Sequence, residues 1–276
     1  MQKVVVVTGA STGIGYDAVR GLVEKNYLVV PTVRKDEDIR KLLNDFGDKV
    51  KPVKLDVGDL KQIDQLAKIL KEELQIKKVY GLVNNAGVAF AAPFSEQDFS
   101  EVAQTINVNV LGLMKVTQVL IPLMDIDSRI INISSVSGKG GAPFLAAYAA
   151  SKHAVEGFSD ALRKEMRLYK IKVVVVGPGT IKTPIWNKGL GDLQDKYSET
   201  VFAEPFRIFM KIVASEIRNA LPVVSVTQCI LDAIESKDPK YRYAPIPRKM
   251  QNWYMPMLIP SKLYNYLTAK TLKLDP

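Results

Sequence analysis

The chain has 276 residues, of which 47% are hydrophobic and 24% are charged, as is ordinary for a globular protein. Cys229 is its only cysteine and His153 its only histidine, which excludes an internal disulfide framework and argues against metal sites built on these residues. The formal net charge is +9, and the region from residue 240 onward is strongly basic.

Six short apolar runs alternate with longer segments of helical periodicity. The runs are continuously apolar, as in strands covered on both faces, and they lie at Val4–Thr8, Leu28–Val33, Val50–Leu55, Val79–Asn84, Arg129–Ser134 and Lys172–Val176. Helical patterns cover Ile14–Lys25, Leu60–Leu74, Phe99–Leu123 and Ala146–Tyr169. We therefore predict a single α/β domain with a doubly wound parallel sheet of the Rossmann type, flanked by helices. Because no apolar run reaches the roughly 18 residues that span a bilayer, we expect a cytoplasmic protein.

A glycine-rich turn follows the first predicted strand. Gly9, Gly13 and Gly15 frame the sequence Gly-Ala-Ser-Thr-Gly-Ile-Gly, and a helical pattern begins there. Glycines let the backbone approach a phosphate, and a helix N-terminus offers free amides and a positive dipole. The spacing differs from the common Gly-x-Gly-x-x-Gly fingerprint, but its position at the start of a βαβ unit still predicts a nucleotide site.

Four further motifs follow this loop in order. They are Asn84-Asn85-Ala86-Gly87, Asn107-Val108-Asn109-Val110, Ser135 with Tyr148-x-x-x-Lys152, and Pro178-Gly179 with Thr183-Pro184. Together with the glycine loop they resemble the short-chain dehydrogenases/reductases, and the segment from Ala146 looks most similar to the retinol- and hydroxysteroid-dehydrogenase members. The resemblance implies a nicotinamide-dependent alcohol dehydrogenase or carbonyl reductase that forms a homodimer or homotetramer.

The resemblance also implies a role for each motif residue. Tyr148 would exchange a proton with the substrate oxygen, and Ser135 would donate a hydrogen bond to it. Lys152 would hold the nicotinamide ribose, and Asn109 would order a water in a proton relay. The cofactor would be held by Gly9, Ser11, Thr12, Gly13, Ile14, Gly15, Arg34, Asp56, Val57, Asn85, Ala86, Gly87, Tyr148, Lys152, Pro178, Gly179, Ile181 and Thr183.

The spacing of Tyr148 and Lys152 supports these roles. Residues four apart on a helix share one face. A free tyrosine has a pKa of about 10, but a nearby ammonium group and an oxidised nicotinamide both favour the phenolate, so we expect the pKa of Tyr148 to fall. Such a pair alone is usually a helix surface feature. Ser135, which follows a predicted strand, makes the catalytic interpretation the better one.

The end of the second strand bears on the choice of nicotinamide. A carboxylate there would select NAD, whereas a cation would receive the 2′-phosphate of NADP. This strand ends in Arg34-Lys35 and no acid occurs before Asp36, so we expect NADP(H) in preference to NAD(H). Thr12 occupies the place inside the glycine loop where many NADP-dependent members carry a cation. The alternative for Arg34 is a solvated loop residue.

We divide the chain into a cofactor and catalytic core at 1–183, a helical substrate lid at 184–225 and a basic aromatic extension at 240–276. The lid has an irregular pattern, and its aromatics could instead pack in the core. Phe90, Ser135, Pro143, Phe144 and Trp186 are expected to meet the substrate, which we expect to be a lipophilic alcohol or carbonyl compound. The extension could cap the cleft, contact a neighbouring subunit or lie peripherally on a membrane.

Three other classes of protein compete with this interpretation. A catalytically silent NADP-binding sensor is the main alternative, although such proteins usually lose part of the set that here includes Asn109, Ser135, Tyr148 and Lys152. A nucleotide-sugar epimerase or dehydratase is disfavoured by the short length of the chain. A nucleic-acid binder is suggested only by the sequence pI of about 9.4, without a recognition motif, so we expect no nucleic-acid partner.

Overall fold

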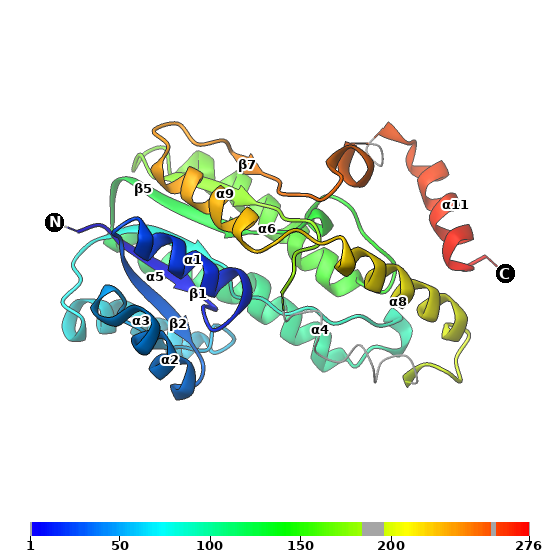
Figure 1. Ribbon diagram of the computed structural model, residues 1–276, viewed down its shortest axis with the longest axis horizontal. Coiled ribbons are helices and arrows are strands. Elements are labelled where there is room, and N and C mark those ends of the chain that lie inside the picture. Colours follow the sequence, from blue (N-terminus) through cyan, green and yellow to red (C-terminus); the bar gives the residue numbers. More distant parts are fainter. Residues whose placement is uncertain (1, 184–195, 255–257, 276) are drawn as a thin grey trace.

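The computed structural model describes residues 2–183, 196–254 and 258–275. It contains a seven-stranded parallel sheet in the order β3-β2-β1-β4-β5-β6-β7, flanked by helices in one Rossmann-type domain, which confirms the predicted fold class (Figure 1). The strands are β1 Val4–Thr8, β2 Leu28–Val33, β3 Val53–Lys54, β4 Val79–Asn84, β5 Met124–Ile133, β6 Lys172–Val176 and β7 Arg242–Tyr243. The helices are α1 Gly13–Glu24, α2 Asp36–Phe46, α3 Leu60–Lys68, α4 Phe99–Ile106, α5 Leu113–Leu120, α6 Ala146–Glu165, α8 Ala203–Arg218, α9 Val224–Glu235 and α11 Ser261–Leu272.

Both faces of the sheet are covered, which is why its strands are continuously apolar. Val5 and Val7 of β1 pack in one buried cluster with side chains of α1 and α9, which lie side by side in Figure 1. Val4 and Val6 point to the other face and pack with side chains of α3, α5 and α6. Successive residues of a strand alternate between faces, so each of these valines removes apolar surface from water.

The segment between Phe99 and Leu123 forms one continuous helical run made of α4, a π-helical turn at Asn107–Gly112, α5 and a final 3-10 turn. By length and composition this run could cross a membrane, contrary to our expectation that no segment would qualify. Of its most apolar stretch, 44% is buried inside the fold. Val116 and Leu120 pack in the cluster beneath the sheet, as the side chains of a core helix do.

The lid region contains more regular structure than its irregular sequence pattern suggests. Its described part includes the 16-residue helix α8 and the start of α9. Phe206, Phe209 and Met210 of α8 are buried in a separate apolar cluster with Phe144, and the ring centroids of Phe144 and Phe206 are 5.2 Å apart. These aromatic side chains therefore pack in the core, which was the alternative to a role in the substrate lid. Trp186 lies outside the described residues.

Candidate active site

The first and fourth strands in chain order are neighbours in the sheet, so the loops after β1 and β4 meet at the same edge. From β1 the chain adds β2 and then β3 toward one edge of the sheet. From β4 it adds β5, β6 and β7 toward the other edge, so the strand order reverses between β1 and β4. Ligands of open α/β sheets bind at such a switch point, outside the carboxyl ends of the strands. The predicted cofactor loop and the Asn-Asn-Ala-Gly segment both lie there.

The glycine loop is shaped by contacts that only glycine permits. Gly9 has φ of +66°, and a Cβ added to it would lie 2.7 Å from the Cα of Ala86. The side chain of Asn85 donates hydrogen bonds of 3.0 Å to the carbonyls of Thr8 and Gly9, and the Thr8 hydroxyl accepts from the amides of Asn85 and Ala86. Two loops that are far apart in the sequence are thereby fixed against each other.

The N-terminus of α1 fits a phosphate group. Thr12 precedes the helix without a side-chain capping bond, and no acidic residue occurs in the first turn. The first amides of a helix need an acceptor, and their positive dipole favours an anion. Gly13, with φ of +59°, and the neighbouring Ser11, Ile14 and Gly15 complete this cradle. The residues present therefore fit the diphosphate of a dinucleotide.

The adenine side of the predicted site is built from the ends of β2 and β3. Arg34 is exposed directly after β2 and has no ion-pair partner among the described residues, whereas Lys35 is paired with Glu37 at 2.9 Å. Asp56 accepts a hydrogen bond of 2.8 Å from the amide of Gly58 and so orders its own turn, and Val57 beside it is buried. An unpaired guanidinium group at this edge is free to receive a phosphate.

Four predicted catalytic residues come from three elements. Asn109 lies in the π-helical turn, Ser135 follows β5, and Tyr148 and Lys152 lie one turn apart on α6. The Nζ of Lys152 is 5.7 Å from the centre of the Tyr148 ring and donates a hydrogen bond of 2.9 Å to the carbonyl of Ile133. Lys152 is thus held between the tyrosine and the end of β5.

Asn109 and Lys152 converge on Gly87. A Cβ on Gly87 would lie 3.2 Å from Oδ1 of Asn109 and 3.8 Å from Nζ of Lys152. The Asn109 side chain accepts from the Val88 amide at 2.8 Å and donates to the Val88 carbonyl at 2.9 Å. It also donates to the Ser151 hydroxyl at 3.1 Å, so it joins the π-helical turn to the Asn-Asn-Ala-Gly segment and to α6.

The pKa of Tyr148 is shifted in the direction opposite to the one expected from the sequence. Burial raises the pKa of Tyr148 above its ordinary value, and the hydrogen-bonding interaction with Ser135 acts in the opposite direction. The expected lowering is therefore wrong for the protein alone, because desolvation of the phenolate outweighs the nearby groups. Burial also lowers the pKa of Lys152 from 10.5 to about 8, against an opposing effect of Glu156.

The remaining cofactor residues lie after β6. The Pro178 carbonyl accepts a hydrogen bond from the Val136 amide at 2.9 Å, and the Gly179 amide donates to the Pro245 carbonyl at 3.0 Å. Ile181 is buried and pairs with Leu221 in an isolated bridge. The motif is thus tied both to the loop of Ser135 and to the segment after β7, and Thr183 ends the first described stretch.

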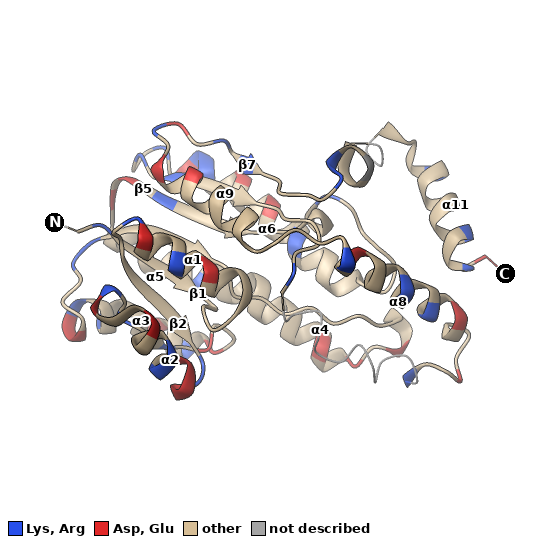
Figure 2. Ribbon diagram, viewed as in Figure 1, with Lys and Arg blue, Asp and Glu red and all other residues tan. Residues whose placement is uncertain are grey.

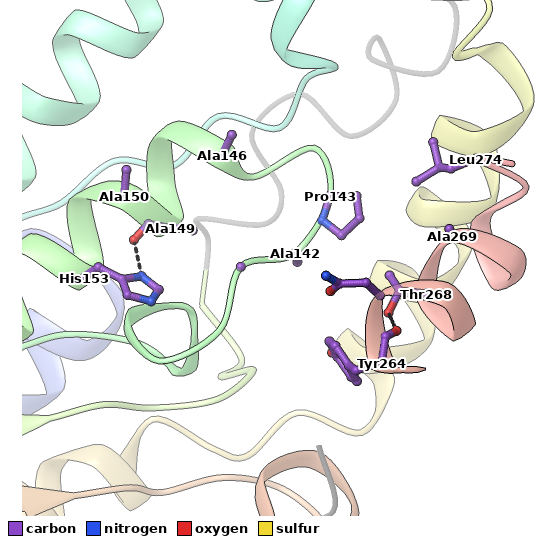
Figure 3. Close-up of a pocket in the computed structure, with 12 residues that line it drawn as sticks. Ala142, Pro143, Ala146, Ala149, Ala150, His153, Tyr264, Thr268, Ala269 and Leu274 are labelled. Carbon is purple, nitrogen blue, oxygen red and sulfur yellow. Dashed lines mark hydrogen bonds between the residues drawn. The ribbon is translucent and has the colours of Figure 1, made fainter. Parts of the chain in front are cut away.

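The predicted substrate residues have different surroundings. Phe90 is half-buried in the loop after β4, and Phe144 is buried among the aromatics of α8. Pro143 lies in an open groove between the start of α6 and the C-terminal helix α11, as Figure 3 shows. His153 lines the same groove, and its Nδ1 lies 2.9 Å from the Ala149 carbonyl.

Sequence reasoning missed two charged residues behind the active site. Glu156 is buried one turn after Lys152, and its carboxylate accepts bonds of 3.1 to 3.3 Å from the guanidinium of Arg242 on β7. Arg242 also donates to the Ser135 carbonyl at 3.3 Å and stacks on Trp253. The spacing of Tyr148, Lys152 and Glu156 along one helix face could have indicated the glutamate, but no local pattern marks Arg242.

Comparison with known proteins agrees with this geometry. Residues 3–192 match the family model described as short chain dehydrogenase. The chain is 33% identical over 274 residues to the NADPH-dependent 3-dehydrocapnine reductase of Ornithobacterium rhinotracheale, covering 97% of this chain and 96% of that one. It is 30% identical over 286 residues to the dehydrogenase/reductase SDR family member 9 of Bos taurus, covering 97% and 88%.

A solved structure shows the same architecture. The crystal structure of a short-chain dehydrogenase from Streptomyces avermitilis superposes with a TM-score of 0.78 at 25% sequence identity, over 97% of this chain and 95% of that chain. The likeness therefore extends beyond the segment that matches the family model and includes the helices after β6.

Proposed function

The chain belongs to the short-chain dehydrogenase family, and from that premise we propose that Tyr148 is the acid–base group of an NADP(H)-dependent reaction that interconverts a lipophilic alcohol and its carbonyl compound. The family membership makes the chain an NAD(P)-dependent oxidoreductase of alcohols and carbonyls. The observation that most supports the finer proposal is the convergence of Tyr148, Ser135 and Lys152 at the carboxyl edge of the sheet.

Each catalytic side chain has a definite task in this proposal. When bound, the nicotinamide supplies the hydride for reduction or accepts it in oxidation. Because burial keeps the pKa of Tyr148 high, its phenol is protonated at neutral pH and can donate a proton to the carbonyl oxygen as that oxygen gains charge. Ser135 donates a hydrogen bond to the same oxygen and so stabilises the developing alkoxide.

Lys152 and Asn109 support the tyrosine. With a pKa of about 8, Lys152 is mostly an ammonium ion at neutral pH, and it favours the phenolate that Tyr148 becomes after proton transfer. We propose that Asn109, which lies next to Lys152 at Gly87, holds the water through which the site regains its proton.

We assign the cofactor to the glycine loop, with NADP(H) preferred over NAD(H). The uncapped start of α1 would hold the diphosphate, and the Asn85–Gly87 segment would line the cleft. Arg34, exposed and unpaired within the described part of the chain, would receive the 2′-phosphate. The NADPH dependence of the reductase that is 33% identical to this chain supports this preference.

A lipophilic substrate fits the apolar surroundings of the proposed site. Phe144 belongs to a buried cluster that includes Phe206, Phe209 and Met210 of α8, within the segment 184–225 that we assign to the lid. Phe90, Pro143 and Trp186 remain proposed substrate contacts. We place the enzyme in the cytoplasm as a homodimer or homotetramer. Within its single domain we assign residues 1–183 to the cofactor and catalytic core, 184–225 to the lid and 240–276 to a C-terminal extension, which begins with the edge strand β7.

A panel of steroid, retinoid, fatty and small polar carbonyls tests the proposal, with oxidation of NADPH or NADH followed by absorbance. We expect turnover with NADPH on lipophilic carbonyls and little turnover on polar ones. Binding of NADPH without turnover on any of them would favour the alternative, a catalytically silent NADP-binding sensor. Failure to bind either cofactor would overturn the proposal.

A further inference from the structure

The C-terminal helix α11 stands on the edge of the domain and is anchored there at its final turn. Leu272 is buried in the apolar cluster of Phe144 and α8, and Lys273 forms an ion pair of 2.7 Å with Glu204 of α8. Thr268 and Ala269 line the groove between α11 and the start of α6 (Figure 3). One face of the helix is therefore directed toward the protein.

The opposite face of α11 is apolar and exposed. At 100° per residue, Leu263, Tyr266 and Leu267 lie together on the side away from Leu272. Their exposed fractions are 49%, 54% and 44%, although side chains of these types usually bury their apolar surface. Leu258 in the segment just before the helix is 82% exposed. Exposed apolar side chains that gather on one helix face, here with Lys270 among them, indicate a contact surface for a partner outside the chain.

The positive charge of α11 indicates that its partner carries negative charge. The sequence of α11 contains Lys262 and Lys270 and no acidic residue, and Figure 2 shows its basic positions without acidic neighbours along the helix. Neither lysine forms an ion pair with a described residue, although the Nζ of Lys270 lies 6.0 Å from the centre of the Tyr266 ring. By contrast, Arg248 and Lys273 are paired with Glu216 and Glu204. Lys262 and Lys270 are therefore left to meet negative charge from outside.

We propose that the outward face of α11 docks on the surface of an anionic lipid bilayer. Leu263 and Leu267 would enter the boundary between headgroups and acyl chains, the Tyr266 ring would lie at the headgroup level, and the two lysines would contact lipid phosphates. A second copy of the chain is a poorer partner, because a symmetric contact through this face would bring the lysines of two identical helices together. Docking does not depend on the proposed reaction, but it would bring an enzyme of lipophilic compounds to the phase where they dissolve.

Sedimentation with lipid vesicles tests this proposal on the full-length protein. Vesicles of phosphatidylcholine alone are compared with vesicles of equal parts phosphatidylcholine and phosphatidylglycerol, at low and high salt. We expect binding to the anionic vesicles, weakened by salt. Leu263→Ser with Leu267→Ser should reduce the affinity by about tenfold per leucine. Lys262→Gln with Lys270→Gln should reduce it by about fivefold per lysine.

A matched control separates docking from general exposure of apolar side chains. Leu168 and Val201 are 89% and 88% exposed outside α11, so Leu168→Ser with Val201→Ser should leave vesicle binding unchanged. Circular dichroism checks that each variant is folded, and light scattering reports self-association. Absence of wild-type binding, equal binding to neutral vesicles, or self-association that requires Leu263 and Leu267 without lipid binding would each overturn the proposal.

Discussion

Replacing Lys152 by methionine should change the stability of the cofactor-free protein in a manner that depends on pH. Burial lowers the pKa of Lys152 from 10.5 to about 8. Between these values the unfolded chain binds a proton that the folded chain does not, so the free energy of unfolding of the wild type rises with pH across this window. Below pH 8 both states are protonated, and the folded state carries the full desolvation cost.

The size of the effect follows from the displacement of the pKa. At about 1.4 kcal/mol per unit, the shift from 10.5 to about 8 corresponds to roughly 3 kcal/mol. The methionine variant avoids this cost at neutral pH, but it also loses the hydrogen bond from Nζ to the Ile133 carbonyl, which costs about 1–2 kcal/mol at every pH. The variant should therefore be more stable than the wild type at pH 7 and less stable at pH 10.5.

Urea unfolding followed by circular dichroism, at intervals between pH 7 and pH 10.5, measures this difference. The free energy of unfolding of Lys152→Met minus that of the wild type should fall by about 3 kcal/mol over the range. Lys164→Met, which replaces an exposed lysine on the same helix, should show no such trend. A difference for Lys152→Met that stays constant with pH would refute the reasoning.

Three further substitutions probe other parts of the site. Arg34→Ala should remove a charge-assisted contact to the 2′-phosphate of NADPH. In steady-state assays the KM for NADPH should rise by about tenfold, and the KM for NADH should not change. Equal effects on both cofactors would count against this role. Gly9→Ala should abolish NADPH binding by fluorescence titration and destabilise the fold by more than its positive φ alone would cost, because the added Cβ meets Ala86. Gly47→Ala, with φ of +59°, ψ of −134° and no neighbour within 4 Å, should show only the backbone strain of about 1–3 kcal/mol. Arg242→Met should lower the free energy of urea unfolding by about 1–3 kcal/mol, because it removes the hydrogen-bonded guanidinium from the buried Glu156 and leaves only the Lys139 ammonium at 3.5 Å. Arg242→Lys should recover part of this loss, and an unchanged stability of the methionine variant would contradict this account.

The strands in the middle of the sheet could be predicted because they are buried on both faces. β1, β2, β4 and β6 have the predicted bounds, since a short run that is apolar at every position is typical of a strand covered on both sides. The edges were predicted less well: β3 is shorter than the predicted run Val50–Leu55, and β7 was not predicted. β7 at Arg242–Tyr243 is two residues long and half-buried, and only its pairing with Val175 and Val176 makes it a strand.

The candidate site was predictable where its residues stand in short motifs. The structure brings Asn109, Gly87 and Lys152 together, as their motifs implied. The pairing of Glu156 with Arg242 spans 86 positions in the chain, and no local periodicity reveals such a contact. The direction of the Tyr148 pKa shift could not be predicted from the sequence either. It depends on the burial of the side chain, which is a property of the packed fold.

The central claim, that Tyr148 carries the proton in an NADPH-dependent carbonyl reduction, is tested most directly by Tyr148→Phe. NADPH oxidation on the best lipophilic carbonyl is compared with the wild type, and NADPH binding is measured on both proteins by fluorescence. The variant should bind NADPH nearly as well and lose at least about a hundredfold in kcat, the lower range for a general acid. A variant that binds NADPH and turns over at the wild-type rate would contradict the account.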